Sequence, residues 1–385
     1  MICRRVQDIK PFIVMDVLEK AQAMERAGIS IIHLEVGEPD FDTPGCVREA
    51  AAAALNRGET HYTHSLGIPQ LREAIASHLE TTYAIPPIDP GRVIITMGSS
   101  PAIFVALATI LENGDEVILS DPHYACYPNF IQFCDGVPKT IPVFEEDGFQ
   151  YRPDDIRKQL TRRTRAIFIN SPANPTGNLL DADRMQAIAD LGTLVLSDEI
   201  YHGLVYEGRA HSILEFTDHC IVFNGFSKLY AMTGLRLGYL IVPTHLIRPI
   251  QKIMQNFFIS ANSVMQWAGY AALTEPCMPE ETRAMVDTYN QRRQFMIRRL
   301  REIGFGITVE PTGAFYVFAN ATRFTRDSYA FAFEVLEKAH VGITPGIDFG
   351  AHGEGYIRFS YANSLENIAE GLNRLEHYLL HRSHC

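Results

Sequence analysis

Short runs rich in aliphatic and β-branched residues alternate with helical patterns through the middle of this chain, and this alternation constrains the fold more than any other feature. The runs cover residues 92–97, 116–121, 165–170, 193–197, 221–226 and 236–242. Strands that are hydrophobic along nearly their whole length are typical of a mostly parallel sheet covered by helices on both faces. Sheets of this kind bind ligands beyond the carboxyl ends of their strands. We therefore expect functional side chains just after these runs.

The length of the chain predicts two domains. It has 385 residues, of which 46% are hydrophobic, enough for one large core and a smaller companion. A polar helical pattern at residues 279–303 links the two parts. An apolar stripe after Ser364 predicts an amphipathic closing helix and comprises Ile368, Leu372, Leu375 and Leu379. We expect residues 45–284 to form the large domain, and residues 1–44 and 285–385 to form the small one.

Composition and charge argue against several classes of protein. The chain has no apolar run of about 18 residues and no apolar signal core near its start, so we expect a cytoplasmic protein without a membrane span. A formal net charge of −11 without long basic stretches argues against a nucleic-acid partner.

Cysteine and histidine usage predicts neither disulfides nor a metal site. The seven cysteines are scattered without a Cys-x-x-Cys pair. One group near the end of the chain has metal-binding residue types, and a solvated terminal helix is its simpler interpretation. Its members are His377, His381, His384 and Cys385.

Three polar clusters lie where strands of the expected sheet end. They are residues 171–177 (SPANPTG), residues 197–201 (SDEIY) and residues 224–239, which include Lys228 and Arg236. A lysine with an asparagine, an aspartate, a tyrosine and an arginine at strand ends is the set of groups that a pyridoxal phosphate pocket needs. The chain thereby resembles the aspartate aminotransferase family of fold type I. This resemblance implies an α/β large domain that binds the cofactor, with a mostly parallel seven-stranded sheet between helices, and a smaller α+β domain built from both termini.

A phosphate clamp is expected at residues 98–101, where a glycine, two serines and a proline follow a strand. Ser100 suits the N-cap of the next helix, so that free amides and the positive end of the helix dipole face an anion. An ordinary strand-to-helix turn is the alternative. The resemblance makes Ser99 and Ser100 phosphate ligands, together with the hydroxyl of Ser227. Arg236 adds a guanidinium that grips phosphate through two hydrogen bonds. The family's aspartate-specific branch often has another serine where this chain has Gly225, so one contact is expected to be absent.

The cofactor ring is expected to meet four further residues. Asp198 ends a strand, where a carboxylate needs a cationic or hydrogen-bonding partner, and a protonated pyridine nitrogen is such a partner; capping the next helix is the alternative. By resemblance, Tyr201 and Asn174 reach the phenolic oxygen and Tyr124 stacks on the ring, while each has an alternative as a turn or core residue. The resemblance also implies cis peptide bonds before Pro122 and Pro175.

The resemblance places substrate and subunit contacts on other segments. Arg358 matches the family's arginine for the substrate α-carboxylate, and a salt-bridged strand residue is the alternative. Gly37 offers a backbone amide to the same carboxylate, or is a turn glycine, and Asn174 also contacts the substrate. Tyr62 resembles the tyrosine that crosses to the phosphate of the other protomer, which implies a homodimer with shared active sites.

The implied activity is transfer of an amino group from an L-amino acid to a 2-oxo acid by a ping-pong mechanism. Lys228 holds the cofactor as a Schiff base and then moves the α-proton as general base and acid, with Asp198 and Tyr201 as the other catalytic residues. We can place no second arginine for a side-chain carboxylate. Aromatic residues suited to an apolar pocket are Phe12, Phe315 and Tyr316.

Other functions remain open on the sequence alone. The same fold and cofactor serve carbon–sulfur lyases and aminocyclopropane carboxylate synthases. A non-catalytic regulator that binds the cofactor is a more remote alternative and needs a DNA-binding segment, for which the N-terminus has no room. A nicotinamide dehydrogenase needs Gly-x-Gly-x-x-Gly after its first strand, and this pattern is missing.

Overall fold

The computed structural model describes residues 2–382, and its centre is a seven-stranded sheet with the order β2-β8-β7-β6-β5-β3-β4. β8 runs antiparallel to both its neighbours, and the pairs β7–β6, β6–β5, β5–β3 and β3–β4 are parallel. The predicted mostly parallel, seven-stranded sheet is therefore confirmed. The strands are β2 (Val93–Thr96), β3 (Glu116–Asp121), β4 (Val137–Pro142), β5 (Thr164–Asn170), β6 (Leu194–Asp198), β7 (Cys220–Gly225) and β8 (Gly238–Ile241).

Two of these strands differ from the sequence prediction. The run at 236–242 was expected to be a strand from its first residue, but β8 begins only at Gly238, because Arg236 has a left-handed backbone with φ 54°. β4 was not among the predicted runs. It lies at the edge of the sheet and only Ile141 of its residues is buried, so it lacks the continuous apolar run of a central strand.

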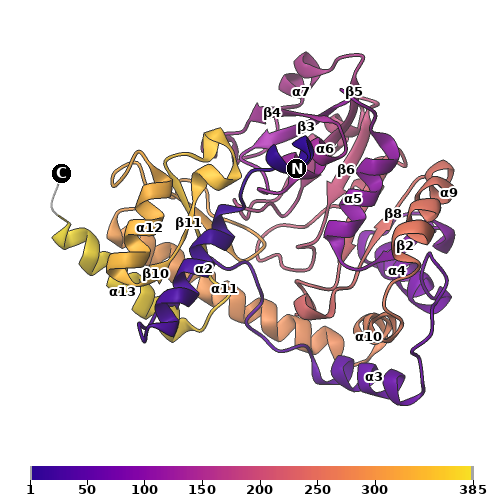
Figure 1. The fold of residues 1–385 in the computed structure, drawn as a ribbon, viewed down its shortest axis with the longest axis horizontal. Helices are drawn as coiled ribbons and strands as arrows, with labels where there is room; N and C mark the ends of the chain where they lie inside the picture. The colour runs from indigo at the N-terminus through magenta and orange to yellow at the C-terminus, as the bar shows by residue number, and fades with distance from the viewer. Residues whose placement is uncertain (1, 383–385) are drawn as a thin grey trace.

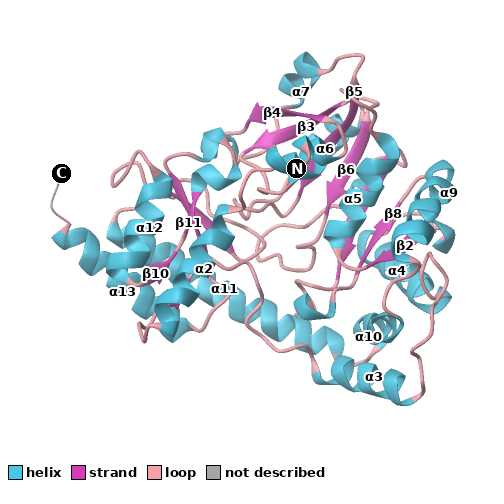
Figure 2. Ribbon diagram, in the orientation of Figure 1, coloured by secondary structure: helices cyan, strands magenta, loops and turns pink. Residues whose placement is uncertain are grey.

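Helices cover both faces of the sheet, as Figure 2 shows. Consecutive strand residues point to opposite faces, so Ile95 and Val195 join one apolar cluster while Ile94 and Leu196 join the other. Burial on both faces explains why the strands are hydrophobic throughout. The helices of this part are α3 (Gly45–Asn56), α4 (Pro69–Tyr83), α5 (Ser99–Ile110), α6 (Tyr127–Phe133), α7 (Pro153–Gln159), α8 (Ala182–Ala189), α9 (Thr244–Ile253) and α10 (Ser263–Thr274), with a π-helix at Met254–Phe258.

Segments from the two ends of the chain lie together in Figure 1, where indigo α2 is beside yellow-orange α12 and α13. They share an apolar cluster that includes Leu34, Phe331 and Leu372. The elements are α1 (Arg4–Gln7), α2 (Ile13–Arg26), β1 (Ile32–His33), α11 (Met278–Ile303), β9 (Tyr316–Asn320), α12 (Ser328–Ala339), β10 (Val341–Gly342), β11 (Thr344–Pro345), β12 (Tyr356–Ser360) and α13 (Leu365–His381). β1 pairs with β10, and β12 lies between β11 and β9 in an antiparallel sheet.

Several local predictions are confirmed. Ser364 caps α13 by accepting a hydrogen bond from Asn367 N at 3.1 Å. The peptide bonds before Pro122 and Pro175 are cis, and so is the bond before Pro172. α11 extends from Met278 to Ile303, close to the predicted linking helix, and it crosses the predicted domain boundary at residue 284. The domain boundaries themselves stay a prediction.

Within residues 2–382, none of the helices combines the length and apolar character needed to span a bilayer. The rings of His377 and His381 lie 4.3 Å apart on α13. His384 and Cys385, the other members of that group, lie outside the described residues.

Candidate active site

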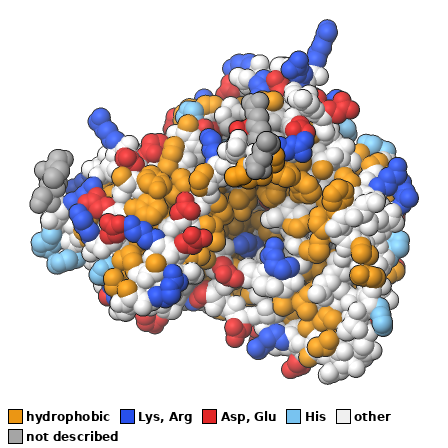
Figure 3. Space-filling model, viewed as in Figure 1, with side chains coloured by type: hydrophobic (Ala, Val, Ile, Leu, Met, Phe, Trp, Pro, Cys, Tyr) orange, Lys and Arg blue, Asp and Glu red, His pale blue; other side chains and the backbone are white. Residues whose placement is uncertain are grey.

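A cavity of about 460 Å³ opens beyond the carboxyl ends of the central strands. Figure 3 shows a hollow in this face of the molecule, with basic side chains in and beside it and apolar ones around it. The cavity brings together most of the predicted site residues: Gly37, Ser99, Ser100, Tyr124, Asn174, Asp198, Tyr201, Ser227, Lys228, Arg236 and Arg358. Tyr62, the remaining one, does not line it, and 81% of its side chain is exposed.

The start of α5 and Arg236 form one wall of the cavity. The expected N-cap at Ser100 is wrong: Gly98 occupies that position with φ 102°, and Ser99 and Ser100 are the first two helical residues. Their backbone N–H groups lie in the first turn, where no carbonyl of the same helix is available to accept a hydrogen bond from them. A Cβ on Gly98 would lie 2.7 Å from Arg236 Nη2, so only glycine lets the guanidinium approach this turn. Among the described residues Arg236 Nη1 donates to an uncharged group, the carbonyl of Thr233, at 2.8 Å, so its charge is left for a phosphate at this end of the cavity.

Asp198 lies at the end of β6 with its side chain fully buried. Its carboxylate accepts hydrogen bonds from Tyr127 Oη at 2.7 Å and from Ile200 N at 3.1 Å. Burial raises the pKa of Asp198 to about 6, and these bonds and the nearby Lys228 oppose the shift. The bond to Ile200 shows that Asp198 also caps the following turn. The carboxylate can accept further hydrogen bonds from the cavity side, where a protonated ring nitrogen would favour its ionised form.

Lys228 follows β7 and points toward Gly37. Its Nζ donates to the carbonyl oxygen of Gly37 at 2.6 Å and lies 5.7 Å from the ring centre of Tyr201. Burial lowers the pKa of Lys228 to about 8, since the charged form loses hydration. A sizeable fraction of the amine is therefore neutral near neutral pH and able to act as nucleophile and base. Gly37 contacts the lysine through its carbonyl, and the predicted role of its amide toward a carboxylate stays a prediction.

Arg358 lies on β12 at the opposite side of the cavity and is only 2% exposed. Its guanidinium donates to Asn174 Oδ1 at 2.9 Å and to the carbonyl of Glu35 at 2.6 Å. The rings of Tyr316 and Phe349 flank it at 4.3 and 4.9 Å. Nε is buried without a hydrogen-bond partner. The hydrogen-bond partners of Arg358 among the described residues are all uncharged groups, the third being Thr344 Oγ1 at 3.2 Å. This speaks against the salt-bridge alternative and leaves a buried cation for an external anion.

The geometry of this site agrees with a comparison of the whole chain. The profile of the family "Aminotransferase class I and II" matches residues 29–375. The chain belongs to this aminotransferase family.

Relatives of this aminotransferase match it along almost their whole length. The (5-formylfuran-3-yl)methyl phosphate transaminase of Methanocaldococcus jannaschii is 41% identical, over 98% of this chain and 100% of the relative. The aspartate/prephenate aminotransferase of Thermus thermophilus is 37% identical, over 98% of each chain. A solved structure of Thermus thermophilus aspartate aminotransferase with maleate superimposes with a TM-score of 0.94 at 36% identity, covering 98% of this chain and 99% of that one.

These matches confirm fold type I and an enzyme that transfers amino groups with pyridoxal phosphate as its cofactor. They do not favour a carbon–sulfur lyase, a cyclopropane-forming enzyme or a non-catalytic regulator. The aminotransferase also has contacts that the sequence did not indicate. Tyr201 Oη lies 2.8 Å from Tyr316 Oη, and the ring of Tyr124 meets that of Phe12 edge-on at 6.0 Å.

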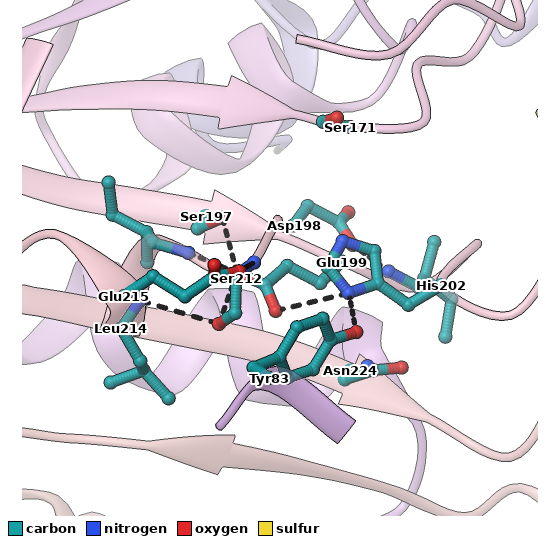
Figure 4. Close-up of polar contacts among 12 residues, drawn as sticks. Tyr83, Ser171, Ser197, Asp198, Glu199, His202, Ser212, Leu214, Glu215 and Asn224 are labelled. Atoms are coloured by element: carbon teal, nitrogen blue, oxygen red, sulfur yellow. Dashed lines mark hydrogen bonds and ion pairs between the residues drawn. The ribbon is translucent and has the colours of Figure 1, made fainter. Parts of the chain in front are cut away.

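A buried polar network behind Asp198 was missed as well (Figure 4). Glu199 is fully buried, and its Oε1 accepts from Ser197 Oγ at 2.9 Å, Ser212 Oγ at 3.1 Å and Ile213 N at 3.0 Å. Its Oε2 lies 3.4 Å from His202 Nδ1, which also contacts Tyr83 Oη. Burial raises the pKa of Glu199 to about 8 and lowers that of His202 to about 3. The sequence held one signal for this network. Glu199 follows Asp198 at the end of a buried strand, and a buried carboxyl group needs hydrogen-bond partners.

Proposed function

We propose that this aminotransferase moves an amino group from an L-amino acid to a 2-oxo acid in a ping-pong cycle in which Lys228 is the catalytic amine. The supporting observation is that three side chains line one cavity: a lysine with a lowered pKa, a buried carboxylate and a buried arginine. They are Lys228, Asp198 and Arg358. Each has a chemical function that this reaction requires. The proposed enzyme works in the cytoplasm.

The residues of the cavity fit pyridoxal phosphate. Bound there, the cofactor supplies an aldehyde for amines and an electron-poor ring that stabilises a carbanion. The first turn of α5, Ser227 and Arg236 are suited to hold its phosphate, and Asp198 to pair with its ring nitrogen. Tyr201 and the amide nitrogen of Asn174 are suited as donors to the phenolic oxygen. The ring face is left to Tyr124.

The chain's own groups account for the proton movement. Lys228 Nζ would accept the α-proton of the amino acid and later deliver it to the former aldehyde carbon, and its lowered pKa near 8 suits both roles near neutral pH. The carbonyl of Gly37 accepts a hydrogen bond from Nζ at 2.6 Å and so fixes the position of the free amine. Arg358 binds the α-carboxylate through its planar guanidinium, and Gly37 N is a second donor to it.

The test of the proposed function replaces Lys228 by alanine and, as a matched control, the exposed Lys158 by alanine. We expect Lys228→Ala to lose at least about 1,000-fold in turnover, since a positioned base alone contributes 100- to 10,000-fold, roughly. Lys158→Ala is expected to keep wild-type turnover. Normal turnover of Lys228→Ala excludes the scheme.

A second measurement separates transamination from lyase chemistry. Transamination forms the new 2-oxo acid only when an amino acceptor is supplied, whereas a lyase releases ammonia without one. Pyruvate and 2-oxoglutarate are the first acceptors to try. The name of the Methanocaldococcus jannaschii relative indicates a furan aldehyde phosphate as a further acceptor.

The proposed enzyme is a homodimer with shared active sites and the domain division expected from the sequence, residues 45–284 against residues 1–44 and 285–385. Tyr62 supports the dimer, since it is 81% exposed and outside the cavity of its own chain. In the dimer it contacts the phosphate bound by the other protomer. Light scattering gives the solution mass, and Tyr62→Phe is expected to weaken cofactor binding several-fold. A fully active monomer contradicts the proposal.

A further inference from the structure

The cavity lining contains few charged side chains, and each basic one among them already has a neighbour within the site. They are Glu38, Asp198, Lys228, Arg236 and Arg358. Arg236 lies at the first turn of α5, Lys228 at Gly37, and Arg358 beside Asn174. Among the described residues that line this cavity, no further lysine or arginine is left to meet a second carboxylate of a substrate. The lining also contains the acidic side chain of Glu38, which repels a second substrate carboxylate.

The part of the cavity that remains for a substrate side chain is apolar. Its wall is the start of α2 and the residue before it: Phe12, Val14, Met15 and Leu18. Val36 and Ile103 continue the same surface. Apolar side chains gather along the upper rim of the hollow in Figure 3, whereas charged ones lie at its lower rim. Such a surface gains free energy by covering apolar groups and loses it by covering an unpaired charge.

Asp348 fixes this wall relative to the groups that bind the substrate. Its carboxylate accepts from Ile13 N at 3.0 Å and from Val14 N at 3.2 Å, which anchors the first turn of α2. The adjacent Phe349 packs on the guanidinium of Arg358. The distance between the carboxylate-binding arginine and the apolar wall is thus set by one short segment, Gly346–Phe349.

We propose that the side-chain subsite of this enzyme is an apolar one, formed by the start of α2, and that its preferred amino donors carry aromatic or aliphatic side chains rather than a second carboxylate. This inference rests on the proposed function. It goes beyond the proposed function by choosing a substrate class, and it separates this chain from the Thermus thermophilus relative, whose name includes aspartate as well as prephenate.

The first test compares amino donors on the wild-type holoenzyme with one acceptor. We expect kcat/KM for phenylalanine, leucine and methionine to exceed that for aspartate and glutamate by about 100-fold, the range over which apolar pockets discriminate. A preference for aspartate overturns the inference, because binding a second carboxylate requires a cation that this lining lacks. The proposed function stands in that case, because transamination of aspartate is still transamination. No reaction with any donor overturns both.

The second test adds the missing cation. Met15→Arg places a guanidinium in the wall at a position that is 44% exposed, so the fold tolerates it. We expect the ratio of kcat/KM for aspartate to that for phenylalanine to rise at least about 10-fold, as for one charge-assisted hydrogen bond. Gln22→Arg is the control, because Gln22 lies two turns further along the same exposed face of α2 and does not line the cavity.

Binding measurements give a readout that does not depend on turnover. The probes are 3-phenylpropanoate and succinate, which share one carboxylate for Arg358 and differ in the other end. We expect wild type to bind 3-phenylpropanoate at least about 10-fold more tightly, and Met15→Arg to reduce or reverse this preference. Equal dissociation constants in wild type, or the same ratio in Met15→Arg and Gln22→Arg, overturn the apolar subsite.

Discussion

Replacing Arg358 by lysine tests the carboxylate site most sharply. The substitution keeps the positive charge and removes the planar group that Tyr316 and Phe349 flank at 4.3 and 4.9 Å. It also removes donors that now bind Asn174 Oδ1 and the carbonyl of Glu35. An ammonium group can replace some of these bonds, but it cannot bind a carboxylate through two parallel bonds while holding both neighbours.

The expected loss follows from that geometry. A hydrogen bond to a charged group contributes about 1.5–3 kcal/mol, so losing one to the substrate carboxylate lowers kcat/KM by about 10- to 150-fold. Because the side chain is only 2% exposed, solvent cannot replace the lost donor. The effect belongs to the carboxylate alone. An amine without that group should lose nothing comparable.

The assay therefore compares phenylalanine with phenethylamine, which has the same side chain and no carboxylate. We expect Arg358→Lys to lower kcat/KM for phenylalanine by about 10- to 150-fold, and for phenethylamine by less than about 3-fold. Arg374→Lys is the matched control, since Arg374 pairs with Glu370 on the surface of α13. A parallel loss with both donors would refute the assignment of Arg358 to the carboxylate.

Three further outcomes follow from contacts in the site. The rate at which cofactor-free protein captures pyridoxal phosphate should rise with pH and level off above about 8, because burial lowers the pKa of Lys228; stopped-flow absorbance measures it, and a midpoint near 10.5 contradicts it. Glu199→Ala should lower the free energy of unfolding by about 2–4 kcal/mol in denaturant titrations, since three buried donors lose their acceptor, whereas Glu199→Gln should lose much less. Asp348→Ala should raise KM for phenylalanine several-fold without changing cofactor affinity; an unchanged KM contradicts the anchoring of α2.

The sequence predicted those site residues whose position depends on the sheet alone. Asp198 is the last residue of one buried strand and Lys228 lies shortly after the end of the next. The carboxyl ends of parallel strands meet at one edge, so their common cavity was foreseeable. The partners that come from remote segments were not foreseeable. Tyr83 reaches His202 across 119 residues of chain, and nothing local to either residue indicates the other.

Backbone geometry limited the prediction in two further places. Arg236 was expected to begin the strand of the run 236–242, yet its left-handed backbone turns the guanidinium toward Gly98. β4 carries Pro138 and Pro142 in a mixed polar pattern, which is compatible with an edge strand but does not announce one. Tyr62 illustrates a different limit, because its predicted contact belongs to a second chain.

The partners of Arg358 have a consequence for how the enzyme matures. The guanidinium is held by residues 35, 174 and 344, whereas the groups that line the same chain's cavity and are suited to the cofactor lie between residues 98 and 236. A ribosome releases the N-terminal part first, so the cofactor-facing groups emerge before residue 358 is made. The site for the substrate carboxylate is therefore the last part of the active site to be completed during synthesis.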